Sequence, residues 1–341
     1  GLIACGFRYR MILMTEPDKA SPTVSILIPV YNREEYIGEC VRSAQEQTYA
    51  DIEIIIVDNA SMDATWKISQ DLAEKDERIR VFQNEENIGP VRNWRRCVEE
   101  ATGDFGKILW SDDLIAPRFL EETLPLLSDP DVGFVFTQAC FFKSGQADGE
   151  IRYQLGETGI YPTEEFIRGE LRGMDYPRSP GCALFRMDDI RTNILVDVPN
   201  NIGSDFSMHA IGNDLLLFLL TANSYNNFGL VAETLSGFRN SKRRELLMCY
   251  DMARAFFVEC YRPDLAKILD VRLALYFLKY PNAVKHGIRG ISGYYMKPRS
   301  TLITPVELFR ALWVQMRRIA FKAISMLKRG RQRFSKPTSE R

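Results

Sequence analysis

The first half of the chain alternates between two spacings of apolar residues. Continuous apolar runs rich in β-branched residues predict strands, and segments with apolar residues three and four positions apart predict helices. The predicted strands cover residues 24–30, 52–61, 79–84, 105–110 and 132–142. The predicted helices cover residues 34–47, a segment reaching about Lys75, 90–101 and 117–127. Strands separated by such helices need crossover connections, so the pattern predicts an α/β fold with a mostly parallel, Rossmann-like central sheet flanked by helices.

Polar side chains stand where these predicted strands end. Asn32, Asp58, Asn84 and the run Ser111-Asp112-Asp113 each follow an apolar run directly or closely. Any one of them could serve only to cap a helix or close a turn. Because the carboxyl ends of parallel strands open into one crevice, their recurrence at successive strand ends predicts a ligand site there.

Composition narrows the chemistry available to such a site. The chain has 341 residues with 45% hydrophobic character, enough for a sizeable core, and its 44 basic and 45 acidic residues nearly cancel. That balance gives no support for nucleic acid as a partner. Seven scattered cysteines without a C-x-x-C pair indicate a reducing, cytoplasmic setting and argue against a zinc site. With only two histidines in the chain, acid–base chemistry falls to carboxylates.

The beginning of the chain is expected to add nothing to the fold. Residues 1–13 are apolar with two arginines, and this stretch is too short to cross a membrane. Met14 opens a hydrophilic stretch and resembles an ordinary start, which leaves open whether residues 1–13 are natural. We therefore predict an unstructured leader over residues 1–21.

Four segments together resemble the family 2 glycosyltransferases. They are VSILIPVYNREEYI (24–37), IIIVDNASMDAT (54–65), NIGPVRNWRRCVEEATGDF (87–105) and ILWSDDLIAPRFLE (108–121). The resemblance covers residues 22–127 and continues more weakly to about residue 245. It implies a GT-A fold and inverting transfer of a sugar from a nucleotide-diphosphate donor, with a UDP-sugar favoured. A dinucleotide-binding domain fits poorly, because Pro-Val-Tyr-Asn stands where a G-x-G-x-x-G turn would be.

The resemblance assigns a set of residues to the donor nucleotide. They are Pro29, Tyr31, Asn32, Glu34, Asp58, Asn59, Asn87, Gly89, Arg92, Asp112 and Arg239. Tyr31 offers a flat face to a base or ribose, and Asp58 could accept a hydrogen bond from the imide N–H of uracil. The arginine position matches the family imperfectly, so Arg95 or Arg96 could replace Arg92, or the basic helix could simply be a solvated face.

The same resemblance identifies Asp113 as a metal ligand, with Asp112 touching ribose or a metal-bound water. Oxygen ligation by few protein groups suits Mn²⁺ or Mg²⁺, with the donor phosphates completing the shell. Ser111 stands where many family members carry a further aspartate, so one carboxylate of the fuller motif is missing.

A general base should follow in the second half of the chain. The candidates are Asp214, which directly precedes an apolar helix as the family's catalytic aspartate does, and Asp205. The pattern favours Asp214, although an aspartate in this place also suits helix capping. We expect His209, between them, to be structural. The following run, residues 227–244, ends in Arg239 and in a basic loop, Ser241 to Arg244, that could contact phosphate or merely be solvated.

The last hundred residues read as helices. Residues 245–261 and 263–280 carry apolar stripes, and residues 305–334 combine an apolar face with many basic residues and almost no acidic ones. That composition is typical of a helix lying on an anionic membrane surface, and the alternative is a packing or dimer helix with a basic tail. We predict three parts: the leader 1–21, a GT-A domain over 22–244 (nucleotide-binding half 22–127, acceptor half 128–244), and a helical region over 245–341.

These observations predict a metal-dependent hexosyltransferase of surface polysaccharide assembly, acting on a saccharide or lipid-linked acceptor. The protein is expected in the cytoplasm or at the inner face of the membrane. Two alternatives remain. A haloacid-type phosphatase also uses paired aspartates, but its nucleophile sits on the first strand, where this chain has Pro29 and Tyr31. A catalytically inactive nucleotide-sugar-binding protein of the same fold is the closer alternative.

Overall fold

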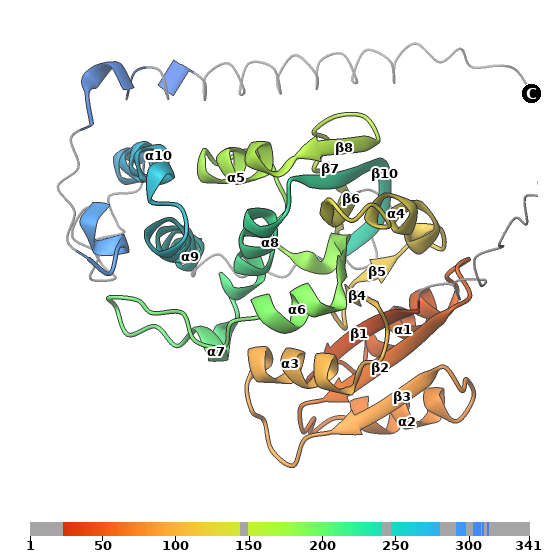
Figure 1. Cartoon of the computed structure of the whole chain (residues 1–341). Helices are drawn as coiled ribbons and strands as arrows, with labels where there is room; N and C mark the ends of the chain where they lie inside the picture. Colours follow the sequence, from red (N-terminus) through yellow and green to blue (C-terminus); the bar gives the residue numbers. More distant parts are fainter. Residues whose placement is uncertain are drawn as a thin grey trace, which may run out of the picture.

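The computed structural model describes residues 23–143, 149–239, 247–279, 291–297, 303–307, 309 and 312–313. Its strands form a single sheet with helices on both faces (Figure 1). The strands are β1 (Val24–Val30), β2 (Ile52–Asp58), β3 (Ile79–Gln83), β4 (Phe105–Ile108), β5 (Leu114–Ile115), β6 (Val132–Phe142), β7 (Glu150–Arg152), β8 (Gly159–Pro162), β9 (Ala183–Arg186) and β10 (Asn227–Arg239). The α/β class predicted from the sequence is confirmed.

Helices of the first half are shorter than their apolar patterns, and further helices follow in the second half. They are α1 (Ile37–Gln45), α2 (Thr65–Ala73), α3 (Pro90–Glu100), α4 (Phe119–Leu127), α5 (Thr163–Leu171), α6 (Met187–Asn193), α7 (Phe206–His209), α8 (Asn213–Ser224), α9 (Leu247–Cys260) and α10 (Ala266–Lys279). Short 3-10 helices occur as η1 (Pro180–Cys182), η2 (Pro263–Leu265) and η4 (Ile291–Tyr294).

Strands β3, β2, β1 and β4 lie side by side in that order and run parallel, as the sequence predicted. Every residue of β1 is buried, because helices cover both of its faces. Beyond β4 the sheet is mixed: β9 runs antiparallel to both β4 and β6, whereas β6 and β10 pair in parallel with register shifts. The strictly parallel part of the sheet is therefore confined to the four strands that carry the N-terminal motifs.

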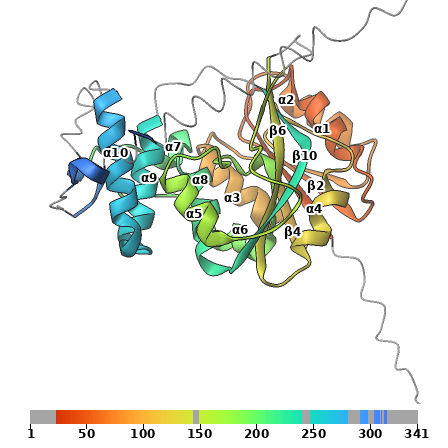
Figure 2. The ribbon, with the colours of Figure 1, turned by 90° about the horizontal axis from the view of Figure 1, so that it is seen from above.

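Side chains of β1 alternate between two apolar layers. Ile26 and Ile28 pack in the layer that contains α1 and α4, whereas Leu27 packs with α3 on the opposite face. The second layer is the larger one and extends through α5, α6 and α8 to α9 and α10. Figure 2 shows α9 and α10 stacked outside α8 and α5. The C-terminal helices thus share a continuous core with the sheet.

The region after α10 is described only in part. Residues 305–307, 309, 312 and 313 are helical, and the exposed side chains include Val306, Phe309, Leu312 and Trp313. The basic loop 241–244 and most of the amphipathic segment 305–334 lie outside the described residues. Among the described helices, none has the length and apolar character needed to cross a bilayer.

Candidate active site

The loop that follows β1 is fastened to the loop that follows β2. Asn32 takes a positive φ of 49°, its backbone N–H donates to Ser61 Oγ (2.8 Å), and its Oδ1 accepts from the Met62 N–H (2.9 Å). Glu34 Oε2 accepts from the Ala64 N–H at 2.8 Å. Pro29 lies within β1, and Tyr31 is partly exposed just beyond the strand. Asn32 and Glu34 therefore shape the predicted nucleotide loop through local bonds, and their contact with a nucleotide stays a prediction.

Asp58, at the end of β2, is fully buried and already has protein partners on both oxygens. Its carboxylate accepts hydrogen bonds from the backbone N–H (3.0 Å) and hydroxyl of Ser61, and from Gln83 Nε2 (2.9 Å). These hydrogen bonds join the end of β2 to the loop that follows it and to the end of β3. Its recognition of uracil stays a prediction, and a ring N–H would have to join or replace these donors.

Four asparagines connect the loops after β2 and β3 with helix α3. Asn59 Nδ2 donates to Asn87 Oδ1, and Asn84 Nδ2 donates to Asn59 Oδ1 and to Asn93 Oδ1, each at 2.8 Å. Asn93 Nδ2 in turn donates to the carbonyl of Val57 at 3.0 Å. The structure shows that Asn59 and Asn87 hold this edge of the sheet together, and their contact with a nucleotide stays a prediction.

Gly89 starts helix α3 in a conformation that favours glycine. Its φ is +82°, and Pro90 follows as the first helical residue. A Cβ at this position would lie 2.7 Å from Met208 Sδ and 3.1 Å from the carbonyl oxygen of Ser207. Gly89 therefore permits α7 to approach the start of α3.

Replacing Gly89 by alanine is expected to destabilise the fold by about 1–3 kcal/mol, because both the positive φ and the crowding against α7 penalise a Cβ. Thermal unfolding followed by circular dichroism measures the effect. Gly38→Ala is the matched control, since a Cβ at Gly38, within α1, meets no atom within 4 Å. An equal loss of stability in both variants would contradict the account of Gly89.

Arg92 projects from α3 to the short helix α7. Its Nη1 donates to Ser207 Oγ at 2.9 Å, and that hydroxyl donates to Asp205 Oδ1 at 2.6 Å. Asp205 also accepts from the Ser207 N–H at 3.0 Å and so caps α7. These hydrogen bonds from Ser207 lower the pKa of the exposed Asp205. Asp205 thus has the surroundings of a capping residue.

Asp112 and Asp113 follow β4 in a tight turn and are held by Arg239 at the end of β10. The Arg239 N–H donates to Asp113 Oδ1 (2.8 Å), its Nε donates to the Asp112 carbonyl (2.9 Å), and its Nη2 bonds Glu39 Oε2 (2.8 Å). The guanidinium lies over the rings of Tyr36 (4.7 Å) and Phe142. The structure therefore brings together Asp112, Asp113 and Arg239, which the sequence proposed as separate parts of one site.

Two positive groups near these aspartates carried no recognisable sequence signal. Arg33 Nε lies 3.7 Å from Asp112 Oδ2. Lys107, a fully buried residue of β4, donates to the carbonyls of Gly181 and Ile108. Burial raises the pKa of Asp113 well above its usual range; Asp112 adds to this, while the Arg239 N–H and Lys107 oppose it. From the sequence alone, a lysine within an apolar run is expected to face solvent, so the burial of Lys107 could not be predicted.

Within the described residues, no three or more His, Cys, Asp or Glu side chains gather to hold a metal ion. Asp112 and Asp113 supply hard carboxylate oxygens, and Asp112 keeps 24% of its side chain exposed. Two such groups fit Mg²⁺ or Mn²⁺ bound mainly through substrate phosphates and water, which need few protein ligands.

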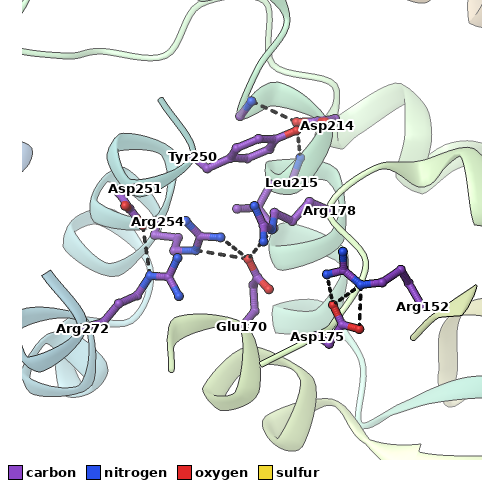
Figure 3. Close-up of polar contacts among 11 residues, drawn as sticks. Arg152, Glu170, Asp175, Arg178, Asp214, Leu215, Tyr250, Asp251, Arg254 and Arg272 are labelled. Carbon is purple, nitrogen blue, oxygen red and sulfur yellow. Dashed lines mark hydrogen bonds and ion pairs between the residues drawn. The ribbon is translucent and has the colours of Figure 1, made fainter. Parts of the chain in front are cut away.

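Asp214 is the second residue of helix α8 and lies almost completely buried. Its Oδ1 accepts from the N–H groups of Gly212 (2.9 Å) and Leu215 (2.8 Å), and its Oδ2 accepts from the Tyr250 hydroxyl (2.9 Å) (Figure 3). Burial raises the pKa of Asp214 to about 6, against the effect of these donors and of Arg178. A carboxyl group with a pKa near neutrality is suited to take up a proton.

His209 has the contacts of a structural histidine. Its Nδ1 accepts from the Ile211 N–H at 3.1 Å, so the Nε2–H faces Ser204 Oγ at 3.0 Å. Burial lowers the pKa of His209, which favours the neutral ring. Both ring nitrogens are therefore engaged within the same loop, in agreement with the interpretation made from the sequence.

The segment from Arg178 to Cys182 lies between the Asp112-Asp113 turn and Asp214. The sequence analysis did not identify it as part of the site. Ser179 Oγ accepts from Trp110 Nε1 (2.7 Å) beside the Asp112-Asp113 turn. At the other end, the Arg178 guanidinium lies 5.3 Å from the ring centre of Tyr250, the partner of Asp214. We call residues 178–182 the η1 segment. It contacts Trp110, just after β4, at one end and Tyr250, the partner of Asp214, at the other.

Comparison with known proteins supports the resemblance seen in the motifs. The profile of the family described as glycosyl transferase family 2 matches residues 25–193. Residues 25–193 belong to glycosyl transferase family 2. This family 2 segment contains β1 to β4, the Asp112-Asp113 turn and the η1 segment, whereas Asp214, Arg239 and Tyr250 lie beyond it.

Two curated relatives each match part of this chain. The putative glycosyltransferase EpsH of Bacillus subtilis (strain 168) is 34% identical over 163 residues, which cover 46% of each chain. The GalNAc(5)-diNAcBac-PP-undecaprenol beta-1,3-glucosyltransferase of Campylobacter jejuni is 31% identical over 130 residues, covering 38% of this chain and 42% of the relative. The chain thus spans less than half the length of these relatives.

A solved structure supports the fold over a longer stretch. The crystal structure of S. aureus TarS 1-349 in complex with UDP has a TM-score of 0.58 and 19% identity, covering 78% of this chain and 75% of that chain. At this identity the comparison speaks to the fold alone. The chain therefore has the GT-A fold expected from its motifs.

Proposed function

We propose that the chain is an inverting glycosyltransferase that moves a sugar from a nucleotide-diphosphate donor to a saccharide or lipid-linked acceptor. The observation that carries this proposal is a pair of buried carboxylates, Asp113 after β4 and Asp214 at the start of α8. The η1 segment lies between them and contacts the surroundings of both. One carboxylate lies where a diphosphate would be held, and the other has a pKa suited to a general base.

A UDP-sugar is the favoured donor. The loops after β1 and β2, with Tyr31 and Asp58, lie at the carboxyl edge of the parallel strands, where α/β sheets bind nucleotides. TarS, which has a similar fold, was crystallised with UDP, and that complex is compatible with a UDP-sugar donor. Arg239, already beside Asp113, supplies positive charge for the diphosphate.

A divalent cation, Mn²⁺ or Mg²⁺, would be held by Asp113, with Asp112 contacting it through water or binding the ribose. When bound, such an ion neutralises charge on the diphosphate leaving group. The chain's own part in this region is to hold Asp113 in place through the Arg239 N–H. Asp214 would take the proton of the acceptor hydroxyl as that oxygen attacks the anomeric carbon in a single displacement, which inverts configuration.

The proposal is tested by calorimetric titration of UDP, GDP and dTDP into the full chain, with Mn²⁺ and then with EDTA. Binding of one nucleotide that depends on the metal would support the proposal and identify the donor class. Absence of binding under every condition would contradict it. Turnover of the matching nucleotide-sugar then separates an enzyme from an inactive binding protein.

We further propose that the setting is surface polysaccharide assembly at the inner face of the membrane. The C. jejuni relative is named for an undecaprenol-linked acceptor, and a lipid-linked acceptor would be reached from the membrane surface. Val306, Phe309, Leu312 and Trp313 are exposed in the described part of the C-terminal segment, and basic residues accompany them in the sequence.

A membrane-bound C-terminal segment predicts that the intact chain floats with liposomes containing anionic lipid and that a chain ending at residue 304 does so far less. Flotation in a density gradient at low and high salt measures this, because attraction to anionic lipid weakens with salt. Equal flotation of the two chains would exclude the segment as the membrane contact.

A further inference from the structure

Helix α9 lies outside the family 2 segment, yet it supplies a direct partner of Asp214. The Tyr250 hydroxyl, on α9, donates to Asp214 Oδ2 at 2.9 Å (Figure 3). The other oxygen, Oδ1, is occupied by two backbone N–H groups. Any proton that Asp214 accepts from a substrate must therefore arrive at Oδ2, the oxygen that Tyr250 contacts.

Tyr250 is itself held by charged neighbours. Its ring centre lies 5.3 Å from the Arg178 guanidinium and 6.0 Å from that of Arg254. Arg178 Nε lies 3.8 Å from Glu170 Oε1, so the same arginine connects Tyr250 to α5. Cations over an aromatic face are attracted to it, which limits the positions that the ring can take.

Arg254 is buried at the centre of an ion network that joins three helices. Its guanidinium bonds Glu170 of α5 and Asp251 of α9, and Asp251 also accepts from Arg272 Nε of α10 at 3.0 Å. We call Glu170, Asp251, Arg254 and Arg272 the Arg254 network (Figure 3). Glu170 and Arg254 are at most 1% exposed, and buried pairs of this kind are costly to break, so the network fixes how α9 packs against α5 and α10.

We propose that Tyr250 is a positioning residue for the Asp214 carboxylate and that the Arg254 network holds it there. This inference rests on the proposed function in one respect, the role of Asp214 as general base. It adds a requirement that the family 2 segment alone does not contain, since α9 must be docked before the base is correctly oriented.

The hydrogen bond leaves the proposed step chemically balanced. The acceptor oxygen bonds to the anomeric carbon, the bond from that carbon to the diphosphate oxygen breaks with its electron pair, and the hydroxyl proton passes to Asp214 Oδ2. Tyr250 uses one lone pair of Oδ2 and leaves another for this proton. The groups that lower the pKa of Asp214 against its burial are Tyr250 of α9, Arg178 and the two backbone N–H groups.

The test is the titration of Asp214 followed by carbon NMR of the full chain labelled at aspartate side-chain carboxyls, with Asp214→Asn used to assign the signal. Tyr250→Phe keeps the ring and removes only the hydroxyl. The expected result is a rise of about one pH unit or more in the Asp214 midpoint, the effect of losing a hydrogen bond to a charged group.

Tyr295→Phe is the matched control, because it removes a similar buried hydrogen bond, from Tyr295 to Asp270 Oδ1 (2.8 Å), in the same helical layer. It should leave the Asp214 midpoint unchanged. An unchanged midpoint in Tyr250→Phe, or an equal shift in both variants, would overturn the inference.

The titration needs no substrate, so its outcome is separate from that of the proposed function, which is tested by sugar transfer in wild type and Asp214→Asn. Where Tyr250→Phe does not fold, Arg178→Gln, which leaves the Tyr250 hydroxyl in place, should also raise the midpoint, and no shift there would count against the arrangement.

Discussion

Replacing Asp214 by asparagine is expected to lower the rate of sugar transfer by about 10²–10⁴-fold, the usual contribution of a general base. The amide keeps an oxygen that can accept from the Gly212 and Leu215 N–H groups, so α8 should begin as before. The loss should therefore appear in kcat, with donor binding retained. A product assay with the donor identified by calorimetry measures it.

The raised pKa of Asp214 gives this prediction a pH dependence. Transfer by the wild type should fall below about pH 6, where the carboxylate becomes protonated. The pKa in the folded protein lies above that in the unfolded chain, so ionisation of Asp214 costs stability as pH rises through 4–6. Asp214→Asn should consequently have a higher Tm than wild type at pH 8, where the wild-type carboxylate is ionised. At pH 4, where it is protonated, the two Tm values should be similar.

Asp205→Asn is the appropriate control for the choice of base. Asp205 is exposed and caps α7 through Ser207, so its amide variant should keep most of the transfer activity. If Asp205→Asn lost activity while Asp214→Asn retained it, the assignment of the base would have to be reversed.

Asp113→Asn is expected to weaken Mn²⁺-dependent nucleotide binding by more than about 10-fold, since even outer-shell partners of metal ligands contribute that much. The amide oxygen can still accept from the Arg239 N–H, so the loop should keep its position. Removing a buried charge whose pKa is raised by burial should not lower the Tm at neutral pH. Calorimetric titration of the nucleotide with Mn²⁺ and with EDTA measures the change.

Asp188→Ala serves as the control for Asp113, because the Asp188 carboxylate is 93% exposed on α6, where it pairs with Arg191 at 2.9 Å. It should bind nucleotide as the wild type does. Metal-dependent binding that survives in Asp113→Asn would remove Asp113 from the metal site and leave Asp112 as the remaining carboxylate of the turn.

Much of the N-terminal sheet could be predicted from local pattern. Strands β1 and β2 are covered on both faces, so their sequences are continuous apolar runs, and the polar residues that end them mark the edge where loops begin. The four motifs lie on these strands and loops, which is why the family and the Asp112-Asp113 turn could be recognised without a structure. The later β9 gave no such signal, and its antiparallel place between β4 and β6 was not foreseen.

The sequence by itself determined the α/β class, the family and the residue types at the strand ends, because burial and turn chemistry are local properties of the chain. Only the tertiary structure decided which distant side chains meet. Arg239 contacts Asp113 across 126 positions, and Tyr250 contacts Asp214 across 36. Local periodicity shows that a helix is buried but not which helix it faces. The partners of both carboxylates therefore depend on how β10 and α9 pack.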